Sequence, residues 1–118
     1  MQALLEELSR ARRSSFLSVL KRFGPAGSGL LSFPIEGYTL TLDLPVSDAE
    51  LFPFLDRLDE IVLKHGGRVY LAKDARLRPE TFRAMYPRLN EWSAVKSQVD
   101  PENKFDSDLA RRLEIGVR

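Results

Sequence analysis

Two adjoining patterns between residues 38 and 64 constrain the fold of this chain more than any other feature. Apolar and polar residues alternate along residues 38–44 (YTLTLDL), which is the two-residue period of a strand with one buried face. Directly afterwards, apolar residues recur at helical spacing from Leu51 to about Lys64. A strand of this kind followed by such a helix predicts a mixed fold in which the helix packs on a sheet.

Local signals predict the two ends of this helix and the element that follows it. Ser47, with Glu50 three residues later, has the form of a capping box. Gly66-Gly67 provides a residue that closes a helix in the left-handed conformation. Residues 68–72 (RVYLA) have the composition of a short strand. A strand–helix–strand unit is therefore expected over residues 38–72.

The remaining segments predict further strands and helices. Residues 15–23 (SFLSVLKRF) predict another strand, which residues 24–29 (GPAGSG) interrupt. Helices are expected at 2–12, 79–85 and 89–99, with an amphipathic turn or helix over 105–113. We expect an α+β fold with a mainly antiparallel sheet and helices packed on one face. One core is expected between sheet and helix, from Leu40, Leu42, Leu55, Leu58, Ile61, Val69 and Leu71.

Composition excludes several classes of function. A length of 118 residues suits one domain over residues 1–118. The chain has no cysteine, and its one histidine, His65, falls in the last turn of the predicted helix, so no metal site is expected. A net charge of +1 gives no support for a nucleic-acid partner. No signal-peptide pattern or apolar run of about 20 residues is present, so we expect a cytoplasmic protein, with association to a membrane surface left open.

Catalytic patterns are sparse, and one charged passage is denser than a solvated surface needs. Residues 24–29 match neither glycine-rich phosphate-binding pattern, and Asp56 with Asp59 or Glu60 lies on a face expected to be solvated. In residues 68–76 (RVYLAKDAR), charged residues follow the predicted strand, where sheet proteins commonly bind ligands. The alternative is an ordinary salt bridge of Lys73 or Arg76 with Asp74.

Several segments resemble one family in sequence order. They are 15–25 (SFLSVLKRFGP), 31–46 (LSFPIEGYTLTLDLPV), 66–76 (GGRVYLAKDAR), 80–87 (ETFRAMYP), 99–101 (VDP) and 105–113 (FDSDLARRL). Together they resemble the C-terminal end of FAD-linked oxidases of the vanillyl-alcohol-oxidase type. The likeness is strongest to the decaprenylphosphoryl-β-D-ribose 2-oxidases and more distant to the D-arabinono-1,4-lactone oxidases. It covers about residues 14–114.

The resemblance implies a function for the chain and a partner. It implies the cap, or substrate, domain of an FAD-dependent oxidoreductase with its C-terminal tail, in which hydride passes from the CH–OH group of a sugar or polyprenyl-phosphate sugar to flavin. The family's FAD-binding domain is absent from this sequence, so FAD is expected to be held mainly by that domain or by a separate subunit, and the isolated chain is expected to be inactive. The alternative is a catalytically silent binding or assembly module derived from the cap, which forms homo-oligomers.

The resemblance also implies six site residues. Lys73 matches a lysine beside the flavin edge and the substrate, where a cation favours the charge that develops during hydride transfer. Tyr70 matches a tyrosine of the same wall and would contact both cofactor and substrate. The remaining substrate-binding positions are Lys21 and Phe23, on the opposite strand, and Thr39 and Thr41, where close relatives carry asparagine and cysteine.

Overall fold

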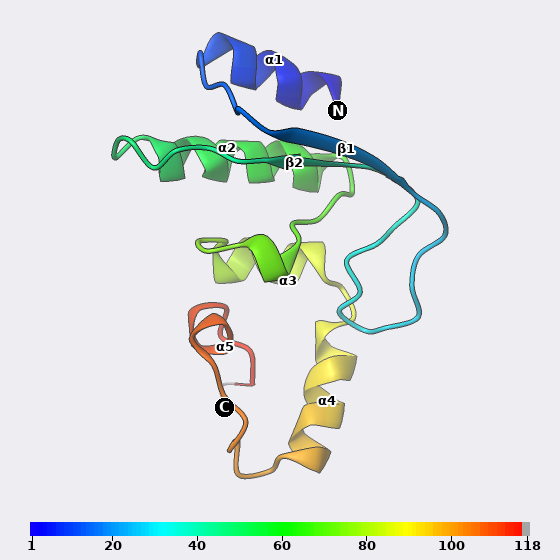
Figure 1. Cartoon of the computed structure of the whole chain (residues 1–118). Coiled ribbons are helices and arrows are strands. Elements are labelled where there is room, and N and C mark those ends of the chain that lie inside the picture. Colours follow the sequence, from blue (N-terminus) through cyan, green and yellow to red (C-terminus); the bar gives the residue numbers. More distant parts are fainter. Residues whose placement is uncertain (117–118) are drawn as a thin grey trace.

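Residues 1–116, which the computed structural model describes, form one antiparallel hairpin and five α-helices (Figure 1). This arrangement confirms the α+β class and the antiparallel sheet expected from the sequence. The helices predicted near residues 2–12, 79–85, 89–99 and 105–113 all form. The elements are α1 (Gln2–Arg10), β1 (Ser18–Phe23), β2 (Gly37–Leu42), α2 (Leu51–Lys64), the short 3₁₀ helix η1 (Leu71–Lys73), α3 (Pro79–Met85), α4 (Leu89–Val99) and α5 (Asp108–Arg112).

The register of the hairpin decides which side chains share a face. β1 pairs with β2 so that Lys21 lies opposite Thr39 and Phe23 lies opposite Gly37. Because directly opposed residues point to the same side, Lys21, Phe23, Thr39 and Thr41 share one face. The other face carries the apolar residues of the predicted alternation. On that face Leu42 packs into a core, whereas Tyr38 is 64% exposed.

A first core lies between α1 and α2. Leu8, Phe54 and Leu58 are buried in it, with Leu4, Leu42, Leu55 and Ile61 packed around them. The guanidinium groups of Arg13 and Arg57 lie over the ring of Phe54, at 5.4 and 5.5 Å from its centroid. Arg13 also pairs with Asp48 at 2.8 Å, which fixes the end of α1 to the turn before α2.

A second core lies between α3 and the C-terminal segment. Its buried residues are Leu77, Phe82, Met85, Tyr86, Leu113 and Ile115. Val69 and Leu71 pack against this second core together with Val62 and Leu63 of α2. The expectation of a single core that includes Val69 and Leu71 is therefore wrong, because α2 separates two clusters and contributes to both.

The strand predicted at residues 68–72 does not form. Both strands of the hairpin pair only with each other, and the polar groups around residue 69 find other partners. The hydroxyl of Tyr86 donates to the carbonyl oxygen of Val69 at 2.7 Å. The chain then turns through η1, so the predicted strand–helix–strand unit is corrected to a hairpin followed by α2 and a 3₁₀ turn.

The signals at the ends of α2 gave one wrong and one right prediction. Glu50, not Ser47, precedes the first helical residue, and Asp48 Oδ1 accepts from the Glu50 amide at 3.0 Å in place of a capping box. Pro53 is tolerated because it lies in the first turn, where backbone N–H groups have no helical partner. At the other end Gly66 takes φ +69°, as predicted.

The chain is elongated for its length. Its Cα radius of gyration is 15.6 Å and its principal extents are 47 × 34 × 22 Å. A compact domain of this length has a radius of gyration of about 13.5 Å. Figure 1 shows α1, the hairpin and α2 at one end and α4 and α5 at the other. Across the described residues, every helix is too short or too polar to reach across a lipid bilayer.

Candidate functional site

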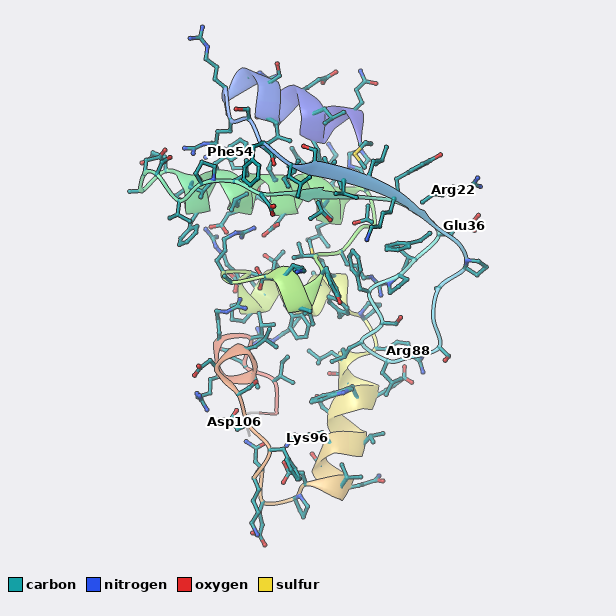
Figure 2. The ribbon with its side chains drawn as sticks, in the orientation of Figure 1. Arg22, Glu36, Phe54, Arg88, Lys96 and Asp106 are labelled. Carbon is teal, nitrogen blue, oxygen red and sulfur yellow. The ribbon has the colours of Figure 1, made fainter. Side chains whose placement is uncertain are left out.

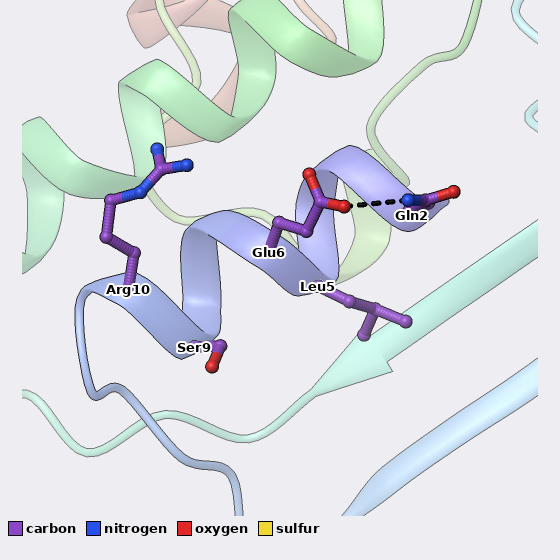
Figure 3. A pocket seen from close by; sticks show the side chains of 5 residues that line it. All are labelled: Gln2, Leu5, Glu6, Ser9 and Arg10. Atoms are coloured by element: carbon purple, nitrogen blue, oxygen red, sulfur yellow. Dashed lines mark hydrogen bonds between the residues drawn. The ribbon is translucent and has the colours of Figure 1, made fainter.

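A surface hollow on α1 is lined by residues of that helix alone. Figure 3 shows its lining residues: Gln2, Leu5, Glu6, Ser9 and Arg10. Gln2 Nε2 donates to Glu6 Oε1 at 2.7 Å, so two of the polar groups satisfy each other. A ligand site needs polar groups that converge from several elements, and this hollow offers the side of one helix.

A second groove, of about 580 Å³, lies between α4 and the segment that leads into α5. Its walls are mainly apolar, and Lys96 and Asp106 stand at its polar end (Figure 2). The ammonium of Lys96 already contacts Asp100 and Asn103, and Asp106 already pairs with Arg111. Lys96 therefore helps to close the turn after α4, and both labelled charges are already paired within the protein.

The residues predicted on the hairpin lie together on one face. Lys21 and Thr39 are directly opposed, and Thr41 follows two residues further along β2 on the same side. Lys21 and Thr41 are exposed, whereas Thr39 and Phe23 are half-buried. The alternation of strand side chains thus collects a cation, two hydroxyls and one aromatic ring on a single face.

An aromatic row joins this face to the segment after α2. The rings of Phe23 and Phe33 meet edge to face, with centroids 5.7 Å apart. The rings of Phe33 and Tyr70 lie 4.9 Å apart with a tilt of 31°. Phe23 and Tyr70, which lie far apart in sequence, therefore belong to one wall. The sequence analysis did not single out Phe33, and its only local signal is its place before Pro34 in LSFP.

Lys73 ends η1 one turn beyond Tyr70. Its amide donates to the Tyr70 carbonyl oxygen at 3.0 Å, which fixes the main chain of the turn. Lys73 is exposed, and over residues 1–116 its ammonium makes neither an ion pair nor a hydrogen bond. Within residues 1–116 the ammonium of Lys73 is therefore unpaired, and no side-chain contact joins it to the aromatic row or to the hairpin.

The salt bridge offered as the alternative for Lys73 is wrong, because Asp74 is engaged elsewhere. Asp74 Oδ1 accepts from the amides of Arg76 and Leu77 at 3.0 and 2.9 Å. Its other oxygen lies 2.8 Å from the guanidinium of Arg112. Asp74 thus caps the turn after η1 and anchors α5, and Lys73 does not take part.

Arg76 pairs with two carboxylates of α2 that the sequence analysis assigned to a solvated face. Its Nη1 lies 2.7 Å from an oxygen of Asp56 and 2.7 Å from an oxygen of Asp59. Asp59 is only 6% exposed, and this burial raises the pKa of its carboxyl although Arg76 opposes the shift. These ion pairs attach residues 74–78 to α2. Separately, no group of side chains within residues 1–116 could hold a metal ion.

Comparison with known proteins shows the family to which this chain belongs. The family model of D-arabinono-1,4-lactone oxidase matches residues 40–113, which is more than half of the chain. The chain belongs to the D-arabinono-1,4-lactone oxidase family. The resemblance to FAD-linked oxidases is thereby confirmed. The stretch matched to this lactone oxidase family contains Thr41, Tyr70 and Lys73.

Two curated relatives extend the match beyond the family model. The chain is 46% identical over 114 residues to decaprenylphosphoryl-beta-D-ribose oxidase from Mycolicibacterium smegmatis, covering 97% of this chain and 25% of that protein. It is 52% identical over 95 residues to an uncharacterized protein in the mprA 5′ region of Streptomyces coelicolor, covering 80% of this chain and 26% of that protein. The chain thus spans about a quarter of the length of these two relatives.

Proposed function

We propose that residues 1–118 form the C-terminal substrate domain of an FAD-dependent oxidoreductase that acts on the CH–OH group of a sugar or sugar-lipid. Family membership supports this proposal, as does the similarity to a relative named for decaprenylphosphoryl-ribose oxidation. The observation that carries it is the free ammonium of Lys73 one turn beyond the exposed ring of Tyr70, at the end of an aromatic row.

The described residues fit one edge of a flavin and not its phosphates. Tyr70, 46% exposed, offers a ring, and Lys73 offers a cation without a protein counter-charge. Phosphates bind to backbone N–H groups, and in the glycine-rich loop the Gly27 amide already donates to the Pro34 carbonyl oxygen. In this proposal the nucleotide is therefore held by an FAD-binding domain or subunit, which is the partner of this chain.

The site residues have distinct roles in the proposed reaction. When bound, FAD supplies the hydride acceptor. The ammonium of Lys73 stabilises negative charge at the reacting edge, where a fixed cation shielded from water acts most strongly. Lys21 and Thr39 donate to sugar hydroxyls, and Phe23 and Tyr70 contact the apolar side of the sugar ring. Thr41 lines the same face and sets the room available to the substrate.

The test of this proposal is a substitution of Lys73 in an oxidase assembled from this chain and the FAD-binding region of a family member. Lys73→Ala should slow flavin reduction by sugar about 100-fold or more. Its melting temperature should stay near that of the parent, because the side chain is exposed and unpaired. Lys73→Gln removes the charge but keeps a long polar side chain, so it separates the effect of charge on the reduction rate from the effect of side-chain size. A reduction rate equal to that of the parent would show that Lys73 is an ordinary surface residue.

Lys64→Ala provides the matched control for this experiment. Lys64 is also an exposed lysine in the last turn of a helix, but it ends α2 and belongs to neither the hairpin nor η1. It should leave both the reduction rate and the melting temperature unchanged. Equal slowing by the Lys64 and Lys73 substitutions would point to net charge and not to a local role.

A further inference from the structure

Phe33 occupies the centre of the aromatic row, although it lies in neither strand. The ring of Phe23 meets it on one side at 5.7 Å and the ring of Tyr70 lies over it at 4.9 Å. Phe33 itself is half-buried, so the residue is not fully enclosed by its neighbours. Among the described residues, Phe33 makes the ring contacts that connect the hairpin face with Tyr70, next to η1.

The side chain of Arg68 attaches the loop that carries Phe33 to the rest of the protein. Arg68 Nη1 donates to the carbonyl oxygen of Ser32 at 2.8 Å, one residue before Phe33. The same guanidinium lies 5.1 Å from the ring centroid of Tyr86, which is 1% exposed. Arg68 therefore links the loop to Tyr86 in the second core. Two residues after Arg68, the same segment carries Tyr70.

A second arginine anchors the loop at its outer end. Arg88, at the start of α4, donates to the carbonyl oxygen of Ser28 at 3.3 Å. Figure 2 shows Arg88 where the long β1–β2 loop reaches the top of α4. The loop that carries Phe33 is thus held at Ser28 and at Ser32, and these two contacts limit the movement of the Phe33 ring.

Polar residues occur in both elements that the aromatic row connects. Lys21 and Thr39 lie on the hairpin side, and Lys73 lies on the side of η1. An apolar floor with a few polar groups at its ends is the composition of sites that bind small polar ligands with apolar faces. A sugar ring has such a form, with C–H bonds on one face and hydroxyls at its edge.

We propose that Phe33 is a specificity-determining residue that contacts the apolar face of the sugar ring, and that Arg68 is the positioning residue that holds it there. This inference rests on the proposed function. It predicts that the fit of the sugar depends on the Phe33 ring, whereas the rate of hydride transfer depends on Lys73.

The test uses the 118-residue chain and methyl β-D-ribofuranoside as the probe, with no redox readout. In NMR titrations, ring resonances of Phe33 and Tyr70 should shift together as the sugar binds. Phe33→Leu keeps an apolar side chain of similar bulk and should weaken binding about fivefold to tenfold. Phe105→Leu is the control, because Phe105 is 80% exposed and lies outside the row. Absence of any shift at Phe33, or equal affinity of Phe33→Leu and parent, overturns the proposal.

Arg68→Lys tests the positioning role separately. It keeps a positive charge but loses the planar fork that bridges Ser32 and the Tyr86 ring. The nuclear Overhauser contact between the Phe33 and Tyr70 rings should weaken even without sugar, and the affinity should fall with it. An unchanged ring contact with unchanged affinity overturns the role of Arg68. Neither experiment involves flavin, so failure here is distinguishable from a failure of the Lys73 test.

Discussion

The hydroxyl of Tyr86 donates to the main-chain carbonyl oxygen of Val69 at 2.7 Å, and this bond ties the segment before η1 to the second core. Tyr86 is 1% exposed, so the carbonyl has a buried donor as its partner. The bond replaces the ladder hydrogen bond that a strand at this position would have made. The next residue, Tyr70, contacts the ring of Phe33.

Tyr86→Phe should therefore destabilise the chain measurably. The substitution keeps the ring but leaves the Val69 carbonyl without its donor, which costs about 1–3 kcal/mol for a buried group. Denaturant unfolding gives the free energy of unfolding directly. Tyr38→Phe is the control, because Tyr38 is 64% exposed and should change stability by less than about 0.5 kcal/mol. Equal losses in the two variants would contradict the role assigned to the bond.

The same residue predicts a response to alkaline pH. Burial raises the pKa of Tyr86 to about 12. An unfolded tyrosine ionises near about pH 10, so the unfolded chain loses this proton first and the free energy of unfolding falls as the pH rises from about 10 towards 12. The slope should be smaller in Tyr86→Phe than in the parent. Identical slopes over this range would show that the Tyr86 hydroxyl is solvated in the folded chain.

At acidic pH the residue to follow is Asp100. It is 7% exposed, and the ammonium of Lys96 together with the amides of Phe105 and Lys104 lowers the pKa of its carboxyl. A lowered pKa contributes stability above the unfolded value of about 3.9, and this stability is lost as the pH falls below that value. Asp100→Asn should remove this part of the acid dependence of the unfolding free energy.

Asp59 changes the acid dependence of the unfolding free energy in the direction opposite to Asp100. Burial raises the pKa of Asp59, so its folded form binds a proton more readily than the unfolded form, and acidification through that range adds stability. Asp59→Asn should therefore steepen the loss of stability on acidification, while Asp100→Asn flattens it. If both variants change the slope in the same direction, one of the two assignments is wrong.

Packing in the first core predicts a large effect at Leu58. Its side chain is 8% exposed and lies with Leu8 and Phe54. Leu58→Ala should lower the free energy of unfolding by about 2–5 kcal/mol, as for other buried leucines. Leu42→Ala should cost less, because Leu42 only borders this core. Leu20→Ala is the control on the exposed part of the hairpin, and a loss there as large as at Leu58 would mean that the hairpin face is buried.

The isolated chain should not retain FAD. In the glycine-rich loop the Gly27 amide already donates to the Pro34 carbonyl oxygen, and the Ser28 carbonyl oxygen accepts from Arg88. After incubation with FAD and gel filtration, the protein peak should be colourless. A flavin absorbance band at one equivalent per chain would show that this sequence binds the nucleotide without a partner.

The elements that depend on local pattern were predictable, and those that depend on a distant partner were not. The period of residues 38–44 and the stripe of α2 predicted both elements, because each pattern is complete within its own segment. Residues 68–72 have the composition of a strand, yet β1 and β2 already pair with each other. A capping box at Ser47 had the right spacing, but the neighbouring Asp48 took the Glu50 amide.

The candidate site divides in the same way. Alternation placed Thr39 and Thr41 on one face of a strand, and the resemblance supplied Lys73 and Tyr70. Phe33 could not be found from local pattern, because it meets Tyr70 only when Arg68 reaches a carbonyl 36 residues earlier in the chain. Contacts of this separation depend on the tertiary fold and leave no periodic trace in the sequence.

The elongated outline of the chain affects how its assembly state is measured. A single copy of 13.4 kDa with extents of 47 × 34 × 22 Å sweeps a larger hydrodynamic volume than a compact globular protein of equal mass. On a sizing column calibrated with compact proteins it would elute early, and one copy would be counted as more than one. Light scattering or sedimentation equilibrium, which report mass independently of shape, is the measurement that separates a long monomer from a dimer.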